Sequence, residues 1–258
     1  DTASFRIPAG VAGQFFVLVE TDYTRDVEET SDFDNAAVAA GIIDIALPPP
    51  ADLVVGAFTV PESGLSGEPV SLTYTVENVG ENPALGRWTD RLYLSEDAQW
   101  DVEDPFFAST DIFGPVPVGD EYTRTVTGPL PGLLPGTYNV ILRTDLFNTV
   151  PESDEANNTG ASDDRIAADA PELAVGEAVT GSIGPNQFRY FKITPPAGET
   201  IRITFDRQIE SGIGELYVSQ GEVPSRTRFD VSALEPFQAD QSLLIPEADA
   251  ATYYIAVF

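Results

Sequence analysis

The sequence predicts an all-β protein built from tandem antiparallel β-sandwiches. Apolar and polar residues alternate in several short segments, which is the period of a strand with one buried face. Gly and Pro, 21 of each, separate these segments at short intervals, as expected for strands joined by turns. One stretch of chain also recurs at a constant offset, which indicates a repeated unit.

The repeat defines the first two domains. Residues 8–22 align without a gap with residues 131–145, and the match continues to Asn35 and Asn158, always 123 positions apart. Residues 1–47 are therefore expected to be the C-terminal part of a module whose complete copy spans residues 51–168.

Strands are expected wherever apolar residues alternate along the chain. The only place for a short helix is near residues 35–40, although the alanines there could equally line an extended edge. The alternating sets are Phe15, Val17 and Val19; Val70, Leu72, Tyr74 and Val76; Tyr138, Val140 and Leu142; Ile201, Ile203 and Phe205; and Tyr253, Ile255 and Val257.

Two proline-containing joints separate the domains. Residues 47–53 contain three consecutive prolines, which hold the chain in a stiff, extended conformation. Residues 169–173 form a second, shorter joint. Residues 171–258 are then a third domain, and because Phe258 falls inside a strand pattern we expect this domain to be truncated at its C-terminus.

The composition excludes several classes of function. The chain has no His and no Cys, which rules out Ser-His-Asp and Cys-His catalysis, imidazole or thiolate zinc sites and disulfides. With 42 Asp and Glu against 13 Lys and Arg, the net charge is −29, so nucleic acids are repelled and cations are the natural partners. The chain has no run of 18 consecutive apolar residues, so we do not expect it to insert directly into a membrane.

Two equivalent acidic loops are candidate calcium sites. Carboxylates crowded at the end of a strand destabilise the fold unless a cation neutralises them, and calcium takes six to eight oxygen ligands in flexible geometry. The alternative is a charged hairpin tip in which the asparagines form a turn. The candidate ligands are Asp22, Glu29, Asp32, Asp34 and Asn35 in the first loop, and Asp145, Glu152, Glu155, Asn157 and Asn158 in the second.

A further acidic cluster follows the predicted strand at residues 91–95. Asp97, Asp101 and Asp104 could wrap a calcium ion, and Asp90 or Asp111 could join them from neighbouring strands. Nothing marks a pair of carboxylates as catalytic, since no Asp-Thr-Gly or Asp-Ser-Gly motif occurs. Lys192, the only lysine, lies in an alternating strand where a solvated amine is expected. We therefore predict no enzymatic activity.

Five motifs occur in order along the middle of the chain. They are Ala51-Asp52-Leu53-Val54-Val55, Tyr74-Thr75-Val76-Glu77-Asn78-Val79-Gly80, Leu92-Tyr93-Leu94-Ser95-Glu96-Asp97, Gly136-Thr137-Tyr138 and Val150-Pro151-Glu152-Ser153-Asp154-Glu155-Ala156-Asn157-Asn158. Together they resemble the bacterial cell-adhesion-related repeat domain, CARDB. The resemblance covers residues 51–168 and in part residues 1–47, and it implies an immunoglobulin-like sandwich of seven strands. It also implies a large secreted or surface-anchored bacterial protein, in which such domains occur in tandem.

The last third of the chain contains a second set of motifs. They are Gly181-Ser182-Ile183, Gln187-Phe188-Arg189-Tyr190-Phe191-Lys192-Ile193, Gly214-Glu215-Leu216-Tyr217-Val218 and Thr252-Tyr253-Tyr254-Ile255-Ala256-Val257. This segment is similar to the bacterial pre-peptidase C-terminal (PPC) domain. That family is a small jelly-roll-like sandwich attached to secreted proteases and other extracellular proteins, and like the CARDB domain it is not catalytic by itself.

The two resemblances, together with the acidic loops, predict non-catalytic structural or adhesive modules of a large extracellular bacterial surface or filament protein. Calcium would stiffen the loops, and the partners would be neighbouring modules or copies of the same protein. The alternative is a non-catalytic spacer or substrate-targeting region of a secreted protease or polysaccharide hydrolase.

Overall fold

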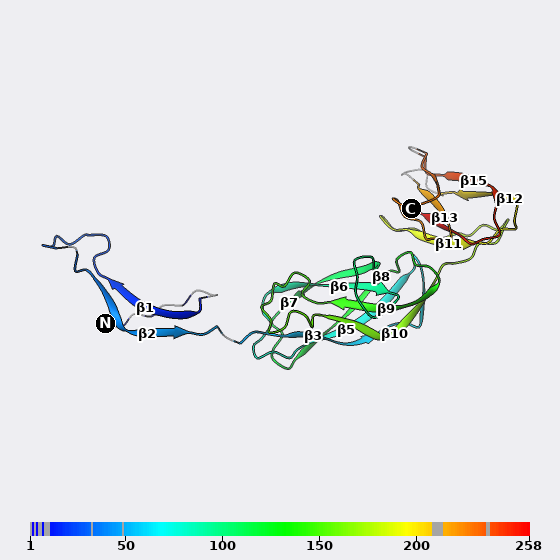
Figure 1. Cartoon of the computed structure of the whole chain (residues 1–258). Coiled ribbons are helices and arrows are strands. Elements are labelled where there is room, and N and C mark those ends of the chain that lie inside the picture. The colour runs from blue at the N-terminus through cyan, green and yellow to red at the C-terminus, as the bar shows by residue number, and fades with distance from the viewer. Residues whose placement is uncertain are drawn as a thin grey trace. The chain divides into compact units, whose positions relative to one another are not determined.

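The computed structural model contains 16 β-strands, and no helix occurs in the part of the chain that it describes (Figure 1). The described residues are 2, 4, 7, 11–31, 33–47, 49–207, 214–235 and 238–258. The chain divides into two compact units, Asp1–Pro49 and Pro50–Phe258. An all-β architecture with antiparallel sheets is what the alternating sequence pattern predicts.

The described residues of the first unit form one antiparallel hairpin. Its strands are β1 (Gly13–Glu20) and β2 (Ala36–Ile45), paired from Gly13 opposite Ile45 to Glu20 opposite Ala36. The alanine-rich segment considered for a short helix is therefore the start of strand β2. Most side chains of the hairpin are exposed, because only one other strand packs against each of them.

The second unit begins with a two-layer sandwich. One sheet has five strands in the order β4-β10-β9-β6-β7, and the other has three in the order β3-β5-β8. All pairs are antiparallel except β4 with β10. The strands are β3 (Leu53–Thr59), β4 (Ser63–Leu65), β5 (Pro69–Asn78), β6 (Arg87–Ser95), β7 (Phe106–Phe113), β8 (Glu121–Pro129), β9 (Gly136–Arg143) and β10 (Thr159–Asp169).

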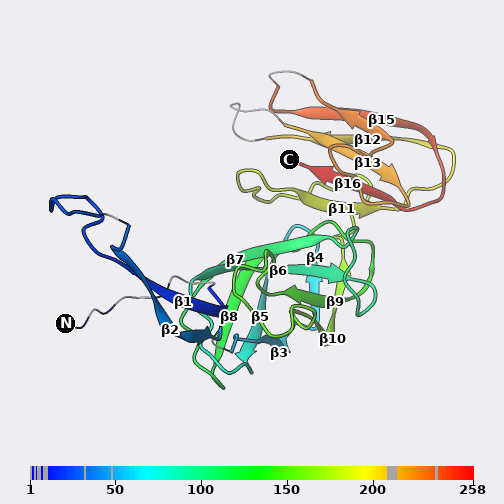
Figure 2. The same ribbon diagram turned by 60° about the vertical axis from the view of Figure 1, so that its left-hand side comes forward.

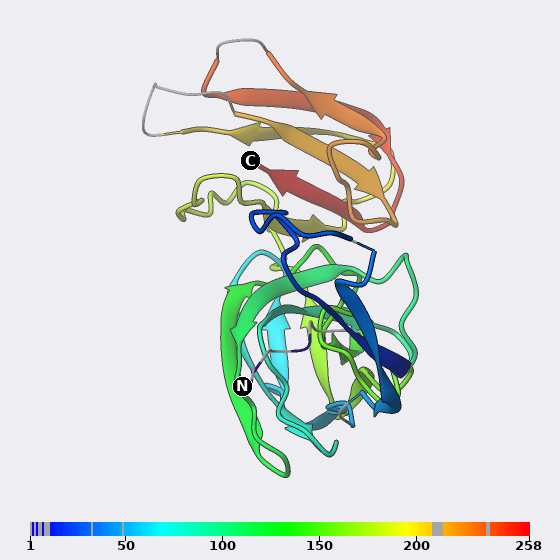
Figure 3. The same cartoon turned by 90° about the vertical axis from the view of Figure 1, so that its left-hand side faces the viewer.

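The core of this sandwich lies between its two sheets, whose cyan and green strands surround it in Figure 3. Alternation places Leu72, Tyr74 and Val76 of β5 inside, each fully buried. Tyr138, Val140 and Leu142 of β9 meet them from the opposite sheet. Burial of this apolar surface, at about 25 cal/mol per Å², is the main force that holds the two layers together.

A second, smaller sandwich follows within the same unit, with β12 and β15 adjacent in one layer and β11, β16 and β13 in the other (Figure 2). Its sheets have the orders β11-β16-β13-β14 and β12-β15, and its core includes Ile203, Leu216 and Ile255. The strands are β11 (Arg189–Ile193), β12 (Glu199–Phe205), β13 (Leu216–Gln220), β14 (Val231–Ala233), β15 (Gln241–Ala248) and β16 (Tyr253–Val257).

The joint at residues 169–173 is tied by main-chain and side-chain bonds. The backbone N–H of Leu173 donates to the carbonyl of Lys192 at 2.8 Å, and that of Lys192 to the carbonyl of Pro171 at 2.9 Å. The Lys192 ammonium lies 2.7 and 2.9 Å from the two carboxylate oxygens of Asp169. Lys192 was expected to be solvated; it is instead mostly covered, because its strand borders the end of β10.

Candidate functional site

The loop between β9 and β10 is organised around one carboxylate. Asp145 is fully buried, and its Oδ1 accepts hydrogen bonds from the backbone N–H of Thr149 at 3.0 Å and from the Thr149 hydroxyl at 2.7 Å. Its Oδ2 accepts the N–H of Val150 at 2.7 Å. Asp145 has a left-handed φ of 38°, which aspartate tolerates in turns. The carboxylate therefore fixes the shape of the loop from inside.

The loop between β1 and β2 repeats this geometry. Oδ1 of Asp22 accepts the N–H of Asp26 at 2.7 Å, Oδ2 accepts the N–H of Val27 at 3.1 Å, and φ is 46°. Each donor lies 123 residues before its counterpart around Asp145. The hydrogen bond that closes each loop is also equivalent. The N–H of Thr21 donates to the carbonyl of Asn35, and the N–H of Thr144 donates to the carbonyl of Asn158, both at 2.9 Å.

Glu152 reaches from the second loop to strand β3. Its Oε2 accepts the N–H of Leu53 at 2.7 Å and its Oε1 accepts the side-chain amide of Asn158 at 3.2 Å. Burial is the largest cause that raises the pKa of Glu152 to about 7; the two hydrogen bonds oppose it, and the Glu155 and Asp145 carboxylates add to it. A cation beside this group would favour its ionised form.

Asn157 and Asn158 leave acceptor atoms without donors. The Nδ2 of Asn157 donates to Asp52 at 2.7 Å and that of Asn158 donates to Glu152, so the orientation of both amides is fixed by carboxylates. The two Oδ1 atoms are buried, and within the described chain neither has a hydrogen-bond partner. A buried amide oxygen without a donor is costly unless water or an ion satisfies it.

The remaining residues of the two loops are less enclosed. Oε1 of Glu155 accepts the N–H of Glu152 at 3.2 Å. Glu29 and Asp34 are exposed, and the backbone carbonyl of Asn35 accepts from Thr21. Asp32 lies outside the described residues. The structure therefore brings Glu152, Glu155 and Asn158 together, but it leaves the corresponding part of the first loop open to solvent.

The cluster after β6 consists of turns that are capped by their own carboxylates. Asp97 accepts the N–H of Gln99 at 2.7 Å, Asp101 that of Glu103 at 2.7 Å, and Asp104 that of Asp101 at 3.0 Å. Neither proposed additional ligand joins this cluster. Asp111 pairs with Arg87 at 2.5 Å, and Asp90 points into the core.

Asp90 is the centre of a buried polar network. Its Oδ2 accepts the hydroxyls of Tyr74 at 2.9 Å and Tyr122 at 2.8 Å, and its Oδ1 accepts that of Thr144 at 2.8 Å. Burial raises its pKa, while these hydrogen bonds lower it. The sequence contains the signal for this position, since Asp90 alternates in phase with the inward-facing Trp88, Leu92 and Leu94.

The residues fit a cation in part. Among the described residues, no group of three or more acidic side chains is arranged to hold a metal ion. The orphaned oxygens of Asn157 and Asn158 and the partly buried Glu152 are nevertheless the kinds of ligand that calcium takes. They would supply two neutral oxygens and one carboxylate, and water would have to complete the shell.

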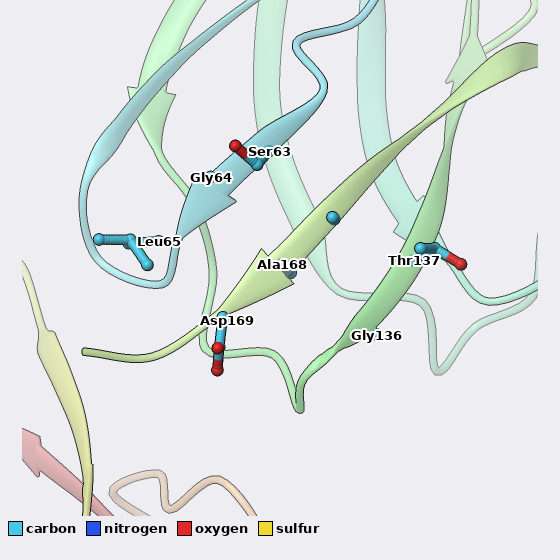
Figure 4. A pocket seen from close by; sticks show the side chains of 8 residues that line it. Ser63, Gly64, Leu65, Gly136, Thr137, Ala168 and Asp169 are labelled. Carbon is cyan, nitrogen blue, oxygen red and sulfur yellow. The ribbon is translucent and has the colours of Figure 1, made fainter. Parts of the chain in front are cut away.

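One hollow in the sandwich is shallow and carries little chemistry. Figure 4 shows it over the ends of β4, β10 and β9, lined mainly by small side chains. Its only ionisable side chain is Asp169, which is paired with Lys192. No helix within the described chain has the length and hydrophobicity needed to span a bilayer.

The five-stranded and three-stranded sheets that pack face to face give the first sandwich of the second unit an immunoglobulin-like architecture. The family model of CARDB matches residues 50–162, and the chain therefore carries a CARDB domain in that segment. This confirms the resemblance drawn from the motifs for the middle of the chain. Comparison with curated proteins gives no match.

Three solved structures illustrate the similarity. The CARDB domain of a Pyrococcus furiosus protein in complex with di-metal ions shares 18% identity, covering 46% of this chain and 89% of that one, with a TM-score of 0.35. Residues 272–376 of a candidate cell surface protein from Methanosarcina acetivorans share 19% identity, covering 46% of this chain and 91% of that one, with a TM-score of 0.35. A β-glucosidase from Erythrobacter marinus shares 13% identity, covering 46% of this chain but only 15% of the enzyme, with a TM-score of 0.31.

Proposed function

We propose that the chain is a non-catalytic part of an extracellular bacterial surface protein, built from repeated CARDB-like modules and a second, smaller sandwich. The observation that carries this proposal is the CARDB match of residues 50–162. The placement of the carboxylates supports the non-catalytic part, because Asp90 is sealed in the core and the acids after β6 cap their own turns. Asp90 is therefore shielded from any substrate, and the acids after β6 are engaged by their own backbone.

The correspondence of the two loops supports the repeat. The hairpin β1–β2 has the hydrogen bonds, the left-handed residues and the strand register of β9–β10, all displaced by 123 residues: Glu20 faces Ala36 as Arg143 faces Thr159. A hairpin with the geometry of the last two strands of a CARDB domain is most simply explained as part of a second such domain.

Localisation is tested directly on cells. An antibody raised against the chain should label intact cells, and brief external protease treatment should remove the label while a cytoplasmic marker survives. Label that appears only after the cells are broken would contradict a surface role. Purified chain should also leave casein and nitrophenyl glycosides unhydrolysed; turnover that co-purifies with the chain would contradict the non-catalytic part.

We further propose that calcium occupies the β9–β10 loop, with Glu152, Asn157 and Asn158 among its ligands. The two donor-free oxygens and the raised pKa of Glu152 support this assignment. A bound ion would satisfy the amide oxygens and offset the repulsion from Glu155. It would also tie the loop to β3 through the Glu152–Leu53 bond, which is the sense in which calcium would stiffen the module.

Calcium titration of the intact chain tests this assignment. If calcium binds only the folded state, it adds RT ln(1 + [L]/Kd) to the free energy of unfolding. The melting temperature at saturating calcium should therefore be higher than the melting temperature in EGTA. Glu152→Gln keeps an acceptor for Leu53 but removes the charge, and should weaken calcium binding by about tenfold or more. The matched control Asp101→Asn/Asp104→Asn, in the other acidic cluster, should bind as tightly as wild type. The assignment would be overturned if wild type bound no calcium, or if the control variant lost calcium binding while Glu152→Gln kept it.

A further inference from the structure

Two arginines lie side by side on the outer face of the five-stranded sheet. Arg91 of β6 and Arg143 of β9 are directly paired in the strand register. Like charges placed opposite each other across two strands destabilise a sheet unless something compensates them. Among the residues that the structure describes, no carboxylate lies within ion-pair distance of either guanidinium, although the chain has 42 acidic residues.

Aromatic rings surround this pair. The Arg91 guanidinium carbon lies 5.9 Å from the ring centres of both Phe106 and Phe147, and that of Arg143 lies 3.9 Å above Trp100. Phe106 is 51% exposed and Phe147 63% exposed. These five residues are called the arginine–aromatic patch below. A guanidinium that stacks on a ring still offers its N–H groups to a carboxylate, often in a bidentate arrangement.

The composition of the patch is that of a protein contact. Aromatic residues and arginine are enriched at the centres of protein interfaces, where a few of them supply most of the binding energy. The best match in charge is a segment that carries an exposed ring next to a carboxylate. Long polyanions fit less well, because the net charge of −29 repels them at long range.

The chain itself contains such a segment. Phe33 is 100% exposed and is followed by the exposed Asp34 in the β1–β2 loop. Ala156 holds the corresponding place in the β9–β10 loop, 123 residues later, and it is exposed although its loop belongs to a complete sandwich. The exposure of Phe33 therefore belongs to its position in the loop and does not depend on what packs against the hairpin.

We propose that the arginine–aromatic patch of one copy binds the Phe33–Asp34 segment of a second copy of this chain. The Phe33 ring would lie against Phe106 and Phe147, and the Asp34 carboxylate would pair with Arg91 and Arg143. The two surfaces are different, so each copy can use one and offer the other, and the contact can extend from copy to copy into chains that stay open unless the rotation between copies closes a ring. The contact does not require calcium, so its test is independent of the metal assignment.

Sedimentation velocity with complementary variants tests the proposal. The intact chain is studied in EGTA and 0.15 M NaCl, where the screening length is about 8 Å and long-range repulsion is reduced. Wild type should form dimers and longer species as its concentration rises. Arg91→Gln/Arg143→Gln removes the charges of the arginine–aromatic patch, and Phe33→Ser/Asp34→Lys removes the Phe33–Asp34 segment. Each variant alone should stay monomeric, because its self-association should be weakened at least about tenfold.

The mixture of the two variants is decisive. Each retains one intact surface, so an equimolar mixture should form one-to-one dimers that grow no further. Arg202→Gln, an exposed arginine of β12 outside the patch, should associate like wild type. Unchanged melting curves would show that all variants are folded. A wild type that is monomeric at every concentration, variants that still associate alone, or a mixture that forms no dimer would each overturn the proposal.

Discussion

At the scale of single residues, Asp90 shows how a charge is accommodated in an apolar core. A buried carboxylate is costly unless hydrogen bonds replace its water. Here three hydroxyl groups donate to it, from Tyr74 of β5, Tyr122 of β8 and Thr144 next to β9. The network therefore connects both sheets through one acceptor, and its members depend on one another.

Removal of one donor should be costly. Tyr74→Phe leaves the ring in place but takes a hydroxyl away from a buried carboxylate, so we expect a loss of about 1.5–3 kcal/mol in the free energy of unfolding by urea. The matched control is Tyr138→Phe, whose hydroxyl donates at 3.0 Å to the neutral carbonyl of Leu134 and should cost only about 0.5–1.5 kcal/mol. Equal losses would contradict the special role of Asp90.

Asp90 should also give stability a pH dependence. Burial raises its pKa in the folded chain above the ordinary value of 3.8, so the folded state keeps this proton to a higher pH than the unfolded state does. The contribution is favourable below pH 3.8 and is lost as pH rises through the raised pKa. Relative to Asp90→Asn, wild type should become progressively less stable from pH 4 upward in urea titrations. A relative gain with rising pH would show that the hydrogen bonds outweigh burial.

At the scale of elements, alternation was a sufficient guide to the strands with one buried face. Residues 70–76 and 138–142 lie in β5 and β9, and residues 201–205 and 253–257 lie in β12 and β16. It was less informative for residues 35–40, because a run of alanines has no apolar period. In this case the partner strand β1 decides the conformation, and that long-range pairing cannot be deduced from local sequence.

The loops show a similar limit. Spacing predicted that Asp22 and Asp145 are ligands, but it gave no sign that both carboxylates also accept hydrogen bonds from the backbone of their own loops. The donor-free oxygens of Asn157 and Asn158 depend on where Asp52 and Glu152 lie, and Asp52 is about a hundred positions away in the chain. The arginine pair in β6 and β9 depends in the same way on strand register, which the sequence does not specify by itself.

The close approach of β10 to β3 gives a prediction for an element. A Cβ placed on Gly160 would lie 2.7 Å from both Cβ and Cγ1 of Val55. Gly160→Ala should therefore overpack the space between the two sheets and lower the free energy of unfolding by about 1–3 kcal/mol. Gly128→Ala is the control, because its added atom would meet Phe107 at an ordinary 3.7 Å. If Gly160→Ala left the free energy of unfolding unchanged in chemical denaturation, strand β3 would have to move away to make room for the added Cβ.

At the scale of the whole molecule, the two sandwiches of the second unit are joined by more than their short linker. Arg189 pairs with Glu68 and Lys192 with Asp169, so two of the five ion pairs among the described residues bridge the sandwiches. The Tyr190 ring packs closely against Gly132, and burial raises the Tyr190 pKa. Such a joint limits bending between the two sandwiches.

The fit at Gly132 makes this joint testable. An added Cβ would lie 2.6 Å from the Tyr190 ring and 2.7 Å from Cγ1 of Val223, both of which belong to the smaller sandwich. Gly132→Ala should separate the sandwiches while each keeps its own core, because the clash lies outside both cores. Digestion by a broad-specificity protease should then cut residues 169–173 several times faster than in wild type, with Gly128→Ala unchanged. The core melting transitions should hardly move, so a large loss of stability without faster cutting would mean that Gly132 supports a single cooperative fold and not a joint between two.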